Sequence, residues 1–342
     1  MERCLELARR GGSRVLPNPL VGVVLVGENG EIIGEGWYKE YGGSHAEVVA
    51  IENVKNKKLL KNATLYVSLE PCNHYGKTPP CTDLIIKSGI KKVVVGCLDP
   101  NPLVAGAGIK KLKDNGIEIV LNHNTTQFQL LNKFFFVNQL ENRPYILLKW
   151  AESKNGVIGS GEVGNPLLIS GDWAKCYVHK LRSEYQAIFV GYNTVIQDNP
   201  KLNTRFFYGD SPIRITMGRG CELPQDSLFF RDEGRAIILN DVKNERVRNI
   251  EWFCPNSSLE NIKGWSSDLY QKFDIGSILV EGGANVLQKF LDEYIFDELM
   301  VIRSSNVLAG KVLAQKVPDS IQLESIEELG KDVVYFYKNK PK

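Results

Sequence analysis

The sequence predicts an α/β protein of two domains, and three observations support this prediction. The length of 342 residues is more than one ordinary core requires. Strand and helix signals alternate through the first part of the chain, which indicates a mostly parallel sheet with helices on both faces. The strand pattern then restarts at Pro144, after the segment ENR, so we expect domains at residues 1–143 and 144–342.

The composition is that of a soluble globular protein, with 43% apolar and 24% charged residues. A formal net charge of +2, without a dense run of Lys or Arg, argues against a nucleic-acid-binding surface. No apolar stretch approaches the length of a membrane span, and the first residues lack the apolar core of a secretory signal. The 7 cysteines are scattered, so we expect reduced thiols in a cytoplasmic protein.

The first part of the chain begins with a short amphipathic helix. Two apolar segments around GENG then predict a β-hairpin. Gly89 is a favourable C-cap for a helix that begins near Cys81. The strands expected here are 20–26, 31–37, 63–71, 90–99 and 117–121, and the helices are 45–54, 81–89, 106–116 and 125–141.

After Pro144, strand-like apolar segments alternate with helical patterns and predict a second sheet. The segments DELMVIRSS and VVYFYK near the C-terminus complete this sheet. The other strands are expected at 145–151, 187–195, 213–218, 235–240 and 277–283, with helices at 171–184 and 284–293.

The segment GGSHAEVVAI, residues 42–51, has two interpretations. Ser44 and Glu47 fit the S-x-x-E capping box, which predicts that a helix begins at Ser44. In that interpretation Glu47 is a structural residue. His45, however, stands two residues before Glu47 in a chain that has only 4 histidines, so the segment is also a candidate metal site.

A second segment, SLEPCNHYGKTPPC, favours the metal site. Cys72 follows an expected strand and Cys81 starts the next helix, and ligands bind at such junctions of α/β sheets. His45, Cys72 and Cys81 are ligand types that Zn²⁺ prefers, and three protein ligands leave a fourth position for water. With Glu47 as general acid and base, this is the arrangement of zinc deaminases, although the spacer between the cysteines is longer than in their C-x-x-C motif.

Four segments, PNPLVG (17–22), HAE (45–47), EPCNHYGKTPPC (70–81) and DPNPLVAGAG (99–108), closely resemble bacterial bifunctional riboflavin-biosynthesis deaminase–reductases. The resemblance implies a cytidine-deaminase-like first domain that hydrolytically deaminates 2,5-diamino-6-ribosylamino-4(3H)-pyrimidinone 5′-phosphate. It also implies substrate contacts from Asn18, His74, Lys77, Asp99 and Asn101. A loop surface position for His74 and turns at Asn18 and DPNP are the structural alternatives.

In the second domain, HKLRSEYQAIFVGYNTVIQDNPKLNTR (179–205) resembles the reductase of the same family. This implies a dihydrofolate-reductase-like fold in which NADPH reduces the ribosyl group and yields 5-amino-6-(5-phosphoribitylamino)uracil. The implied substrate residues are Lys149, Arg182, Leu202, Arg205 and Glu281. The implied NADP residues are Leu168, Thr194, Asp198, Gly283, Ala284, Asn285, Val286, Leu287, Gln288 and Lys289. The two glycines of ILVEGG suit a phosphate at a helix start, although such glycines also serve packing.

Structural alternatives stay open in this domain. The arginines and Lys149 are surface residues in that interpretation, Thr194 and Asp198 form a turn, and Glu281 is a buried salt-bridge partner. Two departures from the family pattern are SKNG, where the family has SLDG, and LLIS, where it has a tryptophan in place of Leu168. A chain with deaminase activity alone and a degenerate second domain therefore remains an alternative.

Two further alternatives are disfavoured by the sequence. A nucleic-acid-editing deaminase conflicts with the near-neutral charge and the long loop between the cysteines. A non-catalytic zinc scaffold conflicts with Glu47 beside an open coordination position. The family resemblance implies small phosphorylated substrates, no nucleic-acid or membrane partner, and a homo-oligomer, as a dimer or larger.

Overall fold

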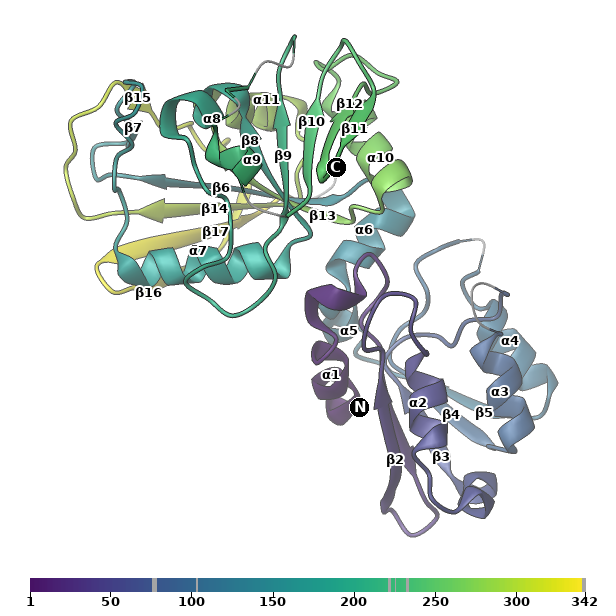
Figure 1. Cartoon of the computed structure of the whole chain (residues 1–342). Coiled ribbons are helices and arrows are strands. Elements are labelled where there is room, and N and C mark those ends of the chain that lie inside the picture. Colours follow the sequence, from purple (N-terminus) through teal and green to yellow (C-terminus); the bar gives the residue numbers. More distant parts are fainter. Residues whose placement is uncertain (76–78, 103, 221–222, 225, 232–233, 340–342) are drawn as a thin grey trace. The chain divides into compact units, whose positions relative to one another are not determined.

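The computed structural model describes residues 1–75, 79–102, 104–220, 223–224, 226–231 and 234–339. The chain divides into two compact units, Met1–Asn142 and Arg143–Lys342 (Figure 1). Each unit has its own sheet and apolar core. No helix of the described residues is long and apolar enough to cross a membrane.

The described part of the first unit contains a sheet in the order β2-β1-β3-β4-β5. β1 pairs antiparallel with β2 and with β3, whereas β3, β4 and β5 are parallel. The predicted hairpin and the strands that follow it are present, each shorter than predicted. Their bounds are Gly22–Val26 (β1), Ile32–Trp37 (β2), Thr64–Val67 (β3), Lys92–Val95 (β4) and Glu118–Leu121 (β5).

Helices cover both faces of this sheet because apolar residues alternate along β1. Val23 and Leu25 face one core, and Val24 faces the other. The first face is covered by α2 (Ala46–Glu52), α3 (Cys81–Ser88) and α4 (Ala107–Asp114) (Figure 1). The second face is covered by α1 (Glu2–Arg9) and α5 (Thr126–Leu131). Short 3₁₀ helices span Gly12–Val15 and Lys57–Asn62.

α2 packs unusually close to the sheet, and a glycine makes this approach feasible. A Cβ on Gly36 of β2 would lie 2.4 Å from the backbone nitrogen of Ala50 in α2. Any side chain at Gly36 would therefore push α2 away from the sheet. Because α2 begins beside His45, this contact also sets the position of the imidazole.

Two predictions about the helices of the first unit are wrong. α2 does not begin at Ser44: its N-cap is His45, which has extended backbone angles, and no side chain caps the helix. Glu47 is only 4% exposed, so its carboxylate is buried within the unit instead of returning to the helix start. The helix predicted over 125–141 is divided into α5 and α6 (Lys133–Glu141). Asn132 interrupts it, since its side-chain amide bonds both backbone groups of Leu20.

The described part of the second unit contains a sheet in the order β11-β12-β10-β9-β8-β13-β6-β14-β17-β16. The parallel strands of this sheet are β12, β10, β9, β8, β13, β6 and β14. Antiparallel strands flank them, with β11 on one side and β17 and β16 on the other. The strands foreseen from the sequence are Tyr145–Glu152 (β6), Ala187–Gly191 (β8), Ile213–Met217 (β9), Ala236–Leu239 (β10), Ser277–Gly282 (β13), Glu298–Arg303 (β14) and Asp332–Lys338 (β17).

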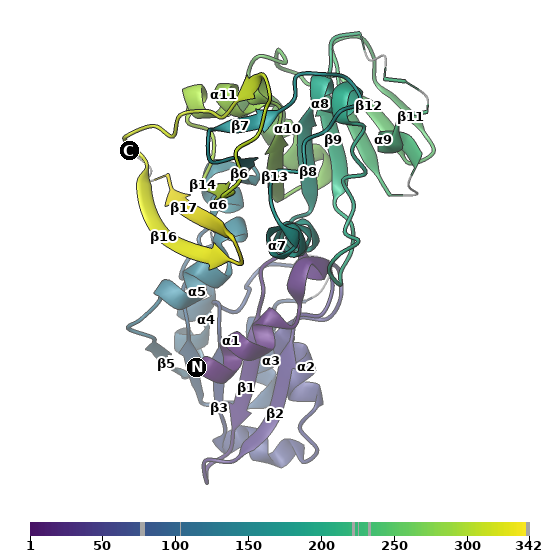
Figure 2. The ribbon, with the colours of Figure 1, turned by 90° about the vertical axis from the view of Figure 1, so that its left-hand side faces the viewer.

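Several elements of this unit are not foreseen from the sequence. β16 pairs with β17 to form a curved ribbon (Figure 2). β7 and β15 form a small separate sheet. The bounds of these elements are Val157–Gly159 (β7), Glu245–Val247 (β11), Ile250–Phe253 (β12), Val312–Leu313 (β15), Gln322–Leu329 (β16), Leu228–Arg231 (α9) and Ile262–Phe273 (α10).

Helices also cover both faces of the second sheet. α10 and α11 (Ala284–Glu293) pack on one face, where Phe189 of β8 stacks on Trp265 with ring centroids 5.3 Å apart. α8 (Tyr192–Asp198) and α9 pack on the other face. α7 (Asp172–Glu184) lies beside β17, since Tyr177 contacts Phe336 edge-on at 6.4 Å.

The strand predicted over 187–195 is wrong beyond Gly191. The chain turns there into α8, with Gly191 as an N-cap in extended conformation. Val195 then packs against the apolar cluster that contains Val190. The β-branched residues of this segment favour a strand, but burial on the sheet face overrides that preference.

Candidate active sites

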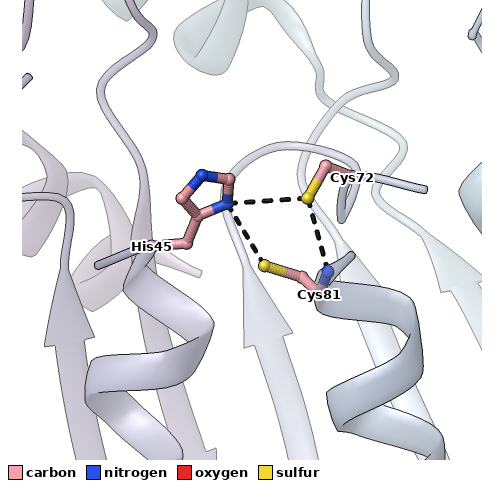
Figure 3. A group of neighbouring side chains, drawn as sticks. All are labelled: His45, Cys72 and Cys81. Carbon is pink, nitrogen blue, oxygen red and sulfur yellow. Dashed lines mark hydrogen bonds between the residues drawn. The ribbon is translucent and has the colours of Figure 1, made fainter. Parts of the chain in front are cut away.

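Three side chains predicted as metal ligands converge in the first unit (Figure 3). The Nδ1 atom of His45 lies 3.5 Å from the Sγ of Cys72 and 3.3 Å from the Sγ of Cys81. The backbone N–H of Cys81 also donates to the Sγ of Cys72 at 3.4 Å. His45 comes from the start of α2, Cys72 follows β3, and Cys81 is the first residue of α3. Segments that are distant in sequence thus supply one compact group of donors.

The spacing of this group suits a zinc ion. All three ligand atoms lie within 4.8 Å of one another. Zinc binds nitrogen at about 2.0 Å and sulfur at about 2.3 Å with tetrahedral angles, so a ligand nitrogen and sulfur should be about 3.5 Å apart. The observed nitrogen–sulfur distances of 3.5 and 3.3 Å meet this requirement. Two thiols and an imidazole are also the donor types that select zinc over harder ions.

The pKa values of the two thiols are displaced in opposite directions. The hydrogen bond from the Cys81 thiol, helped by His45, lowers the pKa of Cys72 against the effect of burial. The same bond and burial raise the pKa of Cys81. The bond to Cys72 raises the pKa of His45. A zinc ion would be held here by the thiolates of Cys72 and Cys81 and the neutral imidazole of His45, so its binding would release protons.

Glu47 is the buried carboxylate of the same site. It lies in the first turn of α2. Burial, followed by the charge of Cys72, raises its pKa to about 7. A carboxyl group with such a pKa exchanges protons readily near neutral pH.

A cavity of about 520 Å³ opens beside the donor group, within the first unit. Its volume is in the range of small-molecule sites. His45, Glu47 and Cys72 contribute to its wall. The polar residues that also line it are Asn18, Tyr38, Tyr41, Glu70, His74, Asp99, Asn101 and Gln139.

Four of the five predicted substrate residues of this unit line the cavity, and Lys77 lies outside the described residues. Asn18 donates from Nδ2 to the Tyr38 hydroxyl at 2.9 Å. The Asp99 carboxylate accepts the backbone N–H of Asn101 at 2.8 Å, so the segment DPNP is a turn as well as part of the wall. His74 is exposed at the cavity rim.

The second unit brings three of its five predicted substrate residues into direct contact. Arg182 of α7 donates from Nε and Nη2 to the two carboxylate oxygens of Glu281, at 2.8 and 2.9 Å. Lys149 of β6 lies 3.4 Å from the same carboxylate. Arg182 also donates to the backbone oxygen of Asn203 at 3.2 Å, which connects this cluster to the segment holding Leu202 and Arg205.

The charges within this cluster are mutually dependent. Burial favours the neutral form of Glu281, but the positive charges of Arg182 and Lys149 lower its pKa to about 2. Burial lowers the pKa of Lys149 despite Glu281. The bidentate contact with Arg182 is shorter than the contact with Lys149, so Arg182 is the main counter-ion of the carboxylate. Lys149 is left as a buried cation whose charge Glu281 only partly balances.

The predicted NADP residues are distributed around the starts of α8 and α11. Gly283 has a φ of 80°, and a Cβ there would lie 3.0 Å from the Thr194 hydroxyl, so these two residues adjoin. Asp198, at the end of α8, and Asn285 are exposed, and Leu168 is 79% exposed on a loop.

The remaining residues of the 283–289 segment have other contacts. Leu287 is buried in the apolar core, and Val286 packs beside Gly191. Gln288 bonds Asp292, and Lys289 pairs with Glu260. The Ala284 carbonyl accepts from Gln315 at 3.0 Å.

Comparisons with known proteins match both units. Residues 1–97 match the family model of the zinc-binding region of cytidine and deoxycytidylate deaminases, and residues 144–335 match that of the RibD C-terminal domain. The riboflavin biosynthesis protein RibD of Aquifex aeolicus is 36% identical over 353 residues, which cover 99% of this chain and 97% of the relative. That of Actinobacillus pleuropneumoniae is 36% identical over 358 residues, covering 98% and 94%.

The chain belongs to the RibD family.

Solved structures agree with this assignment. A diaminohydroxyphosphoribosylaminopyrimidine deaminase/5-amino-6-(5-phosphoribosylamino)uracil reductase from Thermotoga maritima is 37% identical with a TM-score of 0.87, over 99% of this chain and 97% of that chain. RibD of Acinetobacter baumannii is 28% identical with a TM-score of 0.88, over 99% and 98%. As predicted, the first unit has a cytidine-deaminase-like fold and the second a dihydrofolate-reductase-like fold.

Sequence analysis overlooks Glu70, a buried residue of this RibD-family cavity. Its Oε1 atom accepts the backbone N–H groups of Gly108 and Ile109 at 3.0 and 3.3 Å. Its Oε2 atom accepts those of Gly106 and Asp99 at 2.9 and 3.3 Å. Glu70 thereby fixes the start of α4 and the turn that carries Asp99. The only signal in the sequence is its place before Pro71, because backbone donors have no residue-specific pattern.

We predict that Glu70→Gln lowers the free energy of unfolding of the first unit by about 1–3 kcal/mol, the cost of leaving a buried donor unpaired. The glutamine retains one acceptor oxygen, but its NH₂ group would face backbone N–H donors. Denaturant unfolding of the purified chain measures the change. Glu52→Gln, at an exposed glutamate of α2, is the matched control and should leave the midpoint unchanged. An unchanged midpoint for Glu70→Gln would contradict the role assigned to Glu70.

Proposed function

We propose that this chain is a bifunctional enzyme of riboflavin biosynthesis. Its first activity is the hydrolytic deamination of 2,5-diamino-6-ribosylamino-4(3H)-pyrimidinone 5′-phosphate. Its second is NADPH-dependent reduction of the ribosyl group, which gives 5-amino-6-(5-phosphoribitylamino)uracil. The proposal rests on the His45–Cys72–Cys81 group, which lies beside buried Glu47 in a cavity of about 520 Å³. The chain that contains this group aligns with RibD relatives over nearly its whole length.

In this proposal residues 1–143 form the deaminase domain and residues 144–342 the reductase domain. His45, Cys72 and Cys81 hold one Zn²⁺ ion. When bound, the ion lowers the pKa of a coordinated water and so supplies a nucleophile near neutral pH. The three protein donors match the number found in catalytic zinc sites, in contrast to the four of structural sites.

Glu47 is the proton carrier of the deaminase. Its buried carboxylate accepts a proton from the attacking water and donates it to the ring nitrogen. It then accepts the hydroxyl proton of the tetrahedral adduct and donates it to the amine, which leaves as ammonia while the ring carbonyl forms. Burial raises the pKa of Glu47 above that of an exposed glutamate, which suits a group that must both accept and donate. Asn18, His74, Lys77, Asp99 and Asn101 bind the pyrimidine phosphate in this proposal.

In the reductase, NADPH supplies the hydride. The deaminated substrate is bound by Lys149, Arg182, Leu202, Arg205 and Glu281. The two arginines suit its sugar phosphate because their guanidinium groups are fixed. Thr194 and Gly283, which adjoin, form the centre of the NADP site. Its other proposed residues are Leu168, Asp198, Ala284, Asn285, Val286, Leu287, Gln288 and Lys289.

The departure SKNG from the family pattern has a local structural context. Asn155, in the segment SKNG, donates to the Leu308 carbonyl at 2.9 Å and accepts the Leu308 N–H at 3.0 Å. A carboxylate could accept but could not donate in this pair. Asn155 therefore joins two loops of the second unit. Nothing in its contacts favours the alternative of a deaminase with a degenerate second domain.

The proposal also includes a homo-oligomer in the cytoplasm, as the family resemblance implies. Light scattering of the purified chain measures its mass and tests the oligomer. Neither activity depends on this part of the proposal.

The decisive test supplies the purified chain with the diaminopyrimidinone phosphate, with and without NADPH. Without NADPH we expect the deaminated ribosyl compound, and with NADPH the ribityl compound, identified by mass spectrometry. NADPH consumption should require the deaminated compound. Accumulation of the ribosyl compound despite NADPH would instead support deaminase activity alone. If the diamino compound survived unchanged, the deaminase assignment would be wrong.

Removing one metal ligand should abolish zinc binding. We predict that Cys81→Ser reduces the bound zinc from one ion per chain to a trace and abolishes deamination, because zinc prefers thiolate to hydroxyl ligands. Plasma emission spectrometry after dialysis measures the zinc. Cys97→Ser is the matched control: Cys97 is a buried thiol of the same unit whose bond to the Ser68 carbonyl a serine can also form. Full zinc occupancy in Cys81→Ser would refute the ligand assignment.

Removing the proton carrier should separate binding of the metal from chemistry. We predict that Glu47→Gln retains zinc but lowers the rate of deamination by about 10²–10⁴-fold, the usual contribution of general acid–base catalysis. NADPH-dependent reduction of the deaminated compound by the same variant is the internal control and should be unchanged. A variant that holds zinc and deaminates at the rate of the unmodified chain would exclude Glu47 as the carrier.

A further inference from the structure

One face of α7 contacts the segment 202–206 at successive points. Lys175, His179 and Arg182 are spaced four and three residues apart, so they lie on the same side of the helix. The Lys175 ammonium lies 4.3 Å from the ring centroid of Phe206. The His179 Nδ1 atom accepts the backbone N–H of Arg205 at 3.0 Å.

Arg182 completes this series, since it donates to the backbone oxygen of Asn203 at 3.2 Å. The contacts run in opposite directions along the two segments: Lys175 with 206, His179 with 205 and Arg182 with 203. The helix face thus holds the backbone of the segment in one register. His179 supplies the contact with the backbone of Arg205, whose guanidinium lies 4.9 Å from the ring centroid of Phe206.

The segment needs such support because its backbone is strained. Leu202 has a φ of 54° although its side chain is almost fully buried. A non-glycine residue in this region is disfavoured and persists only where the surroundings hold it, often at ligand sites. Further along, the Thr204 N–H donates to Ser211 Oγ at 3.1 Å, and Arg205 Nη1 donates to Asn203 Oδ1 at 2.9 Å.

The environment of His179 suits an acceptor. The side chain is 2% exposed, and its ring contacts Phe206 edge-on with centroids 4.8 Å apart. Burial, followed by the positive charges of Arg182 and Arg205, lowers its pKa to about 4. The charge of Lys175 also lowers the pKa of His179, whereas the charge of Glu281 raises it. The ring is therefore neutral at physiological pH, with its proton on Nε2 and the Nδ1 lone pair directed at Arg205.

We propose that His179 is a positioning residue of the reductase: its imidazole Nδ1 fixes the backbone of Arg205 and so directs the Arg205 guanidinium to the substrate phosphate. This inference rests on the proposed role of Arg205 as a phosphate ligand. His179 itself touches neither substrate nor cofactor in this arrangement. Its effect is expected in the affinity for the phosphorylated substrate and not in the hydride transfer.

The test compares two substitutions with opposite expectations. His179→Leu removes the acceptor and should weaken the Kd for the deaminated pyrimidine phosphate by about 5- to 100-fold, because the charge-assisted hydrogen bond from a misplaced Arg205 to the phosphate is weakened or lost. His179→Asn places Oδ1 close to the position of Nδ1 and should restore the Kd to within about threefold of the unmodified chain. Isothermal titration calorimetry measures the Kd without requiring turnover. The Kd for NADPH and the rate of deamination should not change in either variant.

A double-mutant cycle shows whether His179 acts through Arg205. If it does, His179→Leu combined with Arg205→Ala should bind the substrate no more weakly than Arg205→Ala alone. Additive losses, or equal losses in His179→Leu and His179→Asn, would overturn the inference. An unchanged Kd in His179→Leu would overturn it as well.

The same titrations separate this inference from the proposed function. An unmodified chain that binds the compound but does not oxidise NADPH would refute reductase activity and still allow the His179 comparison. An unmodified chain that does not bind it would overturn both.

Discussion

Compensation of buried carboxylates is the constraint on which both sites depend. A carboxylate removed from water costs several kcal/mol unless hydrogen-bond donors or cations surround it. Glu70 in the first unit meets four backbone N–H groups, and Glu281 in the second meets Arg182 and Lys149. Because each set of donors must stay in place, each carboxylate fixes the segment that supplies them. Glu70 positions the turn at Asp99 in this way. Glu281 likewise positions Arg182, through which the end of α7 contacts the segment 202–206.

Glu47 shows what happens when compensation is weaker. It is as buried as Glu70, but it lies beside the thiol group of Cys72 and not among several cations. Its pKa therefore rises to about 7, whereas that of Glu281 falls to about 2. The same chemical group is thus a proton carrier in one environment and a permanent anion in another. Two environments, set by neighbouring residues, thus assign different tasks to the two carboxylates.

The sequence predicts the order of the main elements and the zinc group, because the H-x-E and P-C segments combine specific residue types at helix and strand ends. It does not predict Glu70 or His179, whose partners are backbone N–H groups of segments that are distant in sequence. Tertiary contacts also explain the wrong boundaries. Asn132 divides a helix because it bonds Leu20, and the chain beyond Gly191 becomes helical because Val195 is buried on the sheet. Helix and strand propensities depend on local sequence, so they predict neither of these tertiary contacts.

The buried charges of the second unit bear on whether it is an active domain. A buried ion cluster contributes little to stability, since well-packed apolar residues of similar volume often serve a core as well or better. Lys149, Arg182 and Glu281 nevertheless place three charges together at the ends of β6, α7 and β13. Their arrangement leaves Lys149 only partly balanced and directs Arg182 toward the segment of Arg205. A cluster of this kind fixes the segment that it contacts, and its positive charges also give it a physical rationale as a binding site for an anionic substrate.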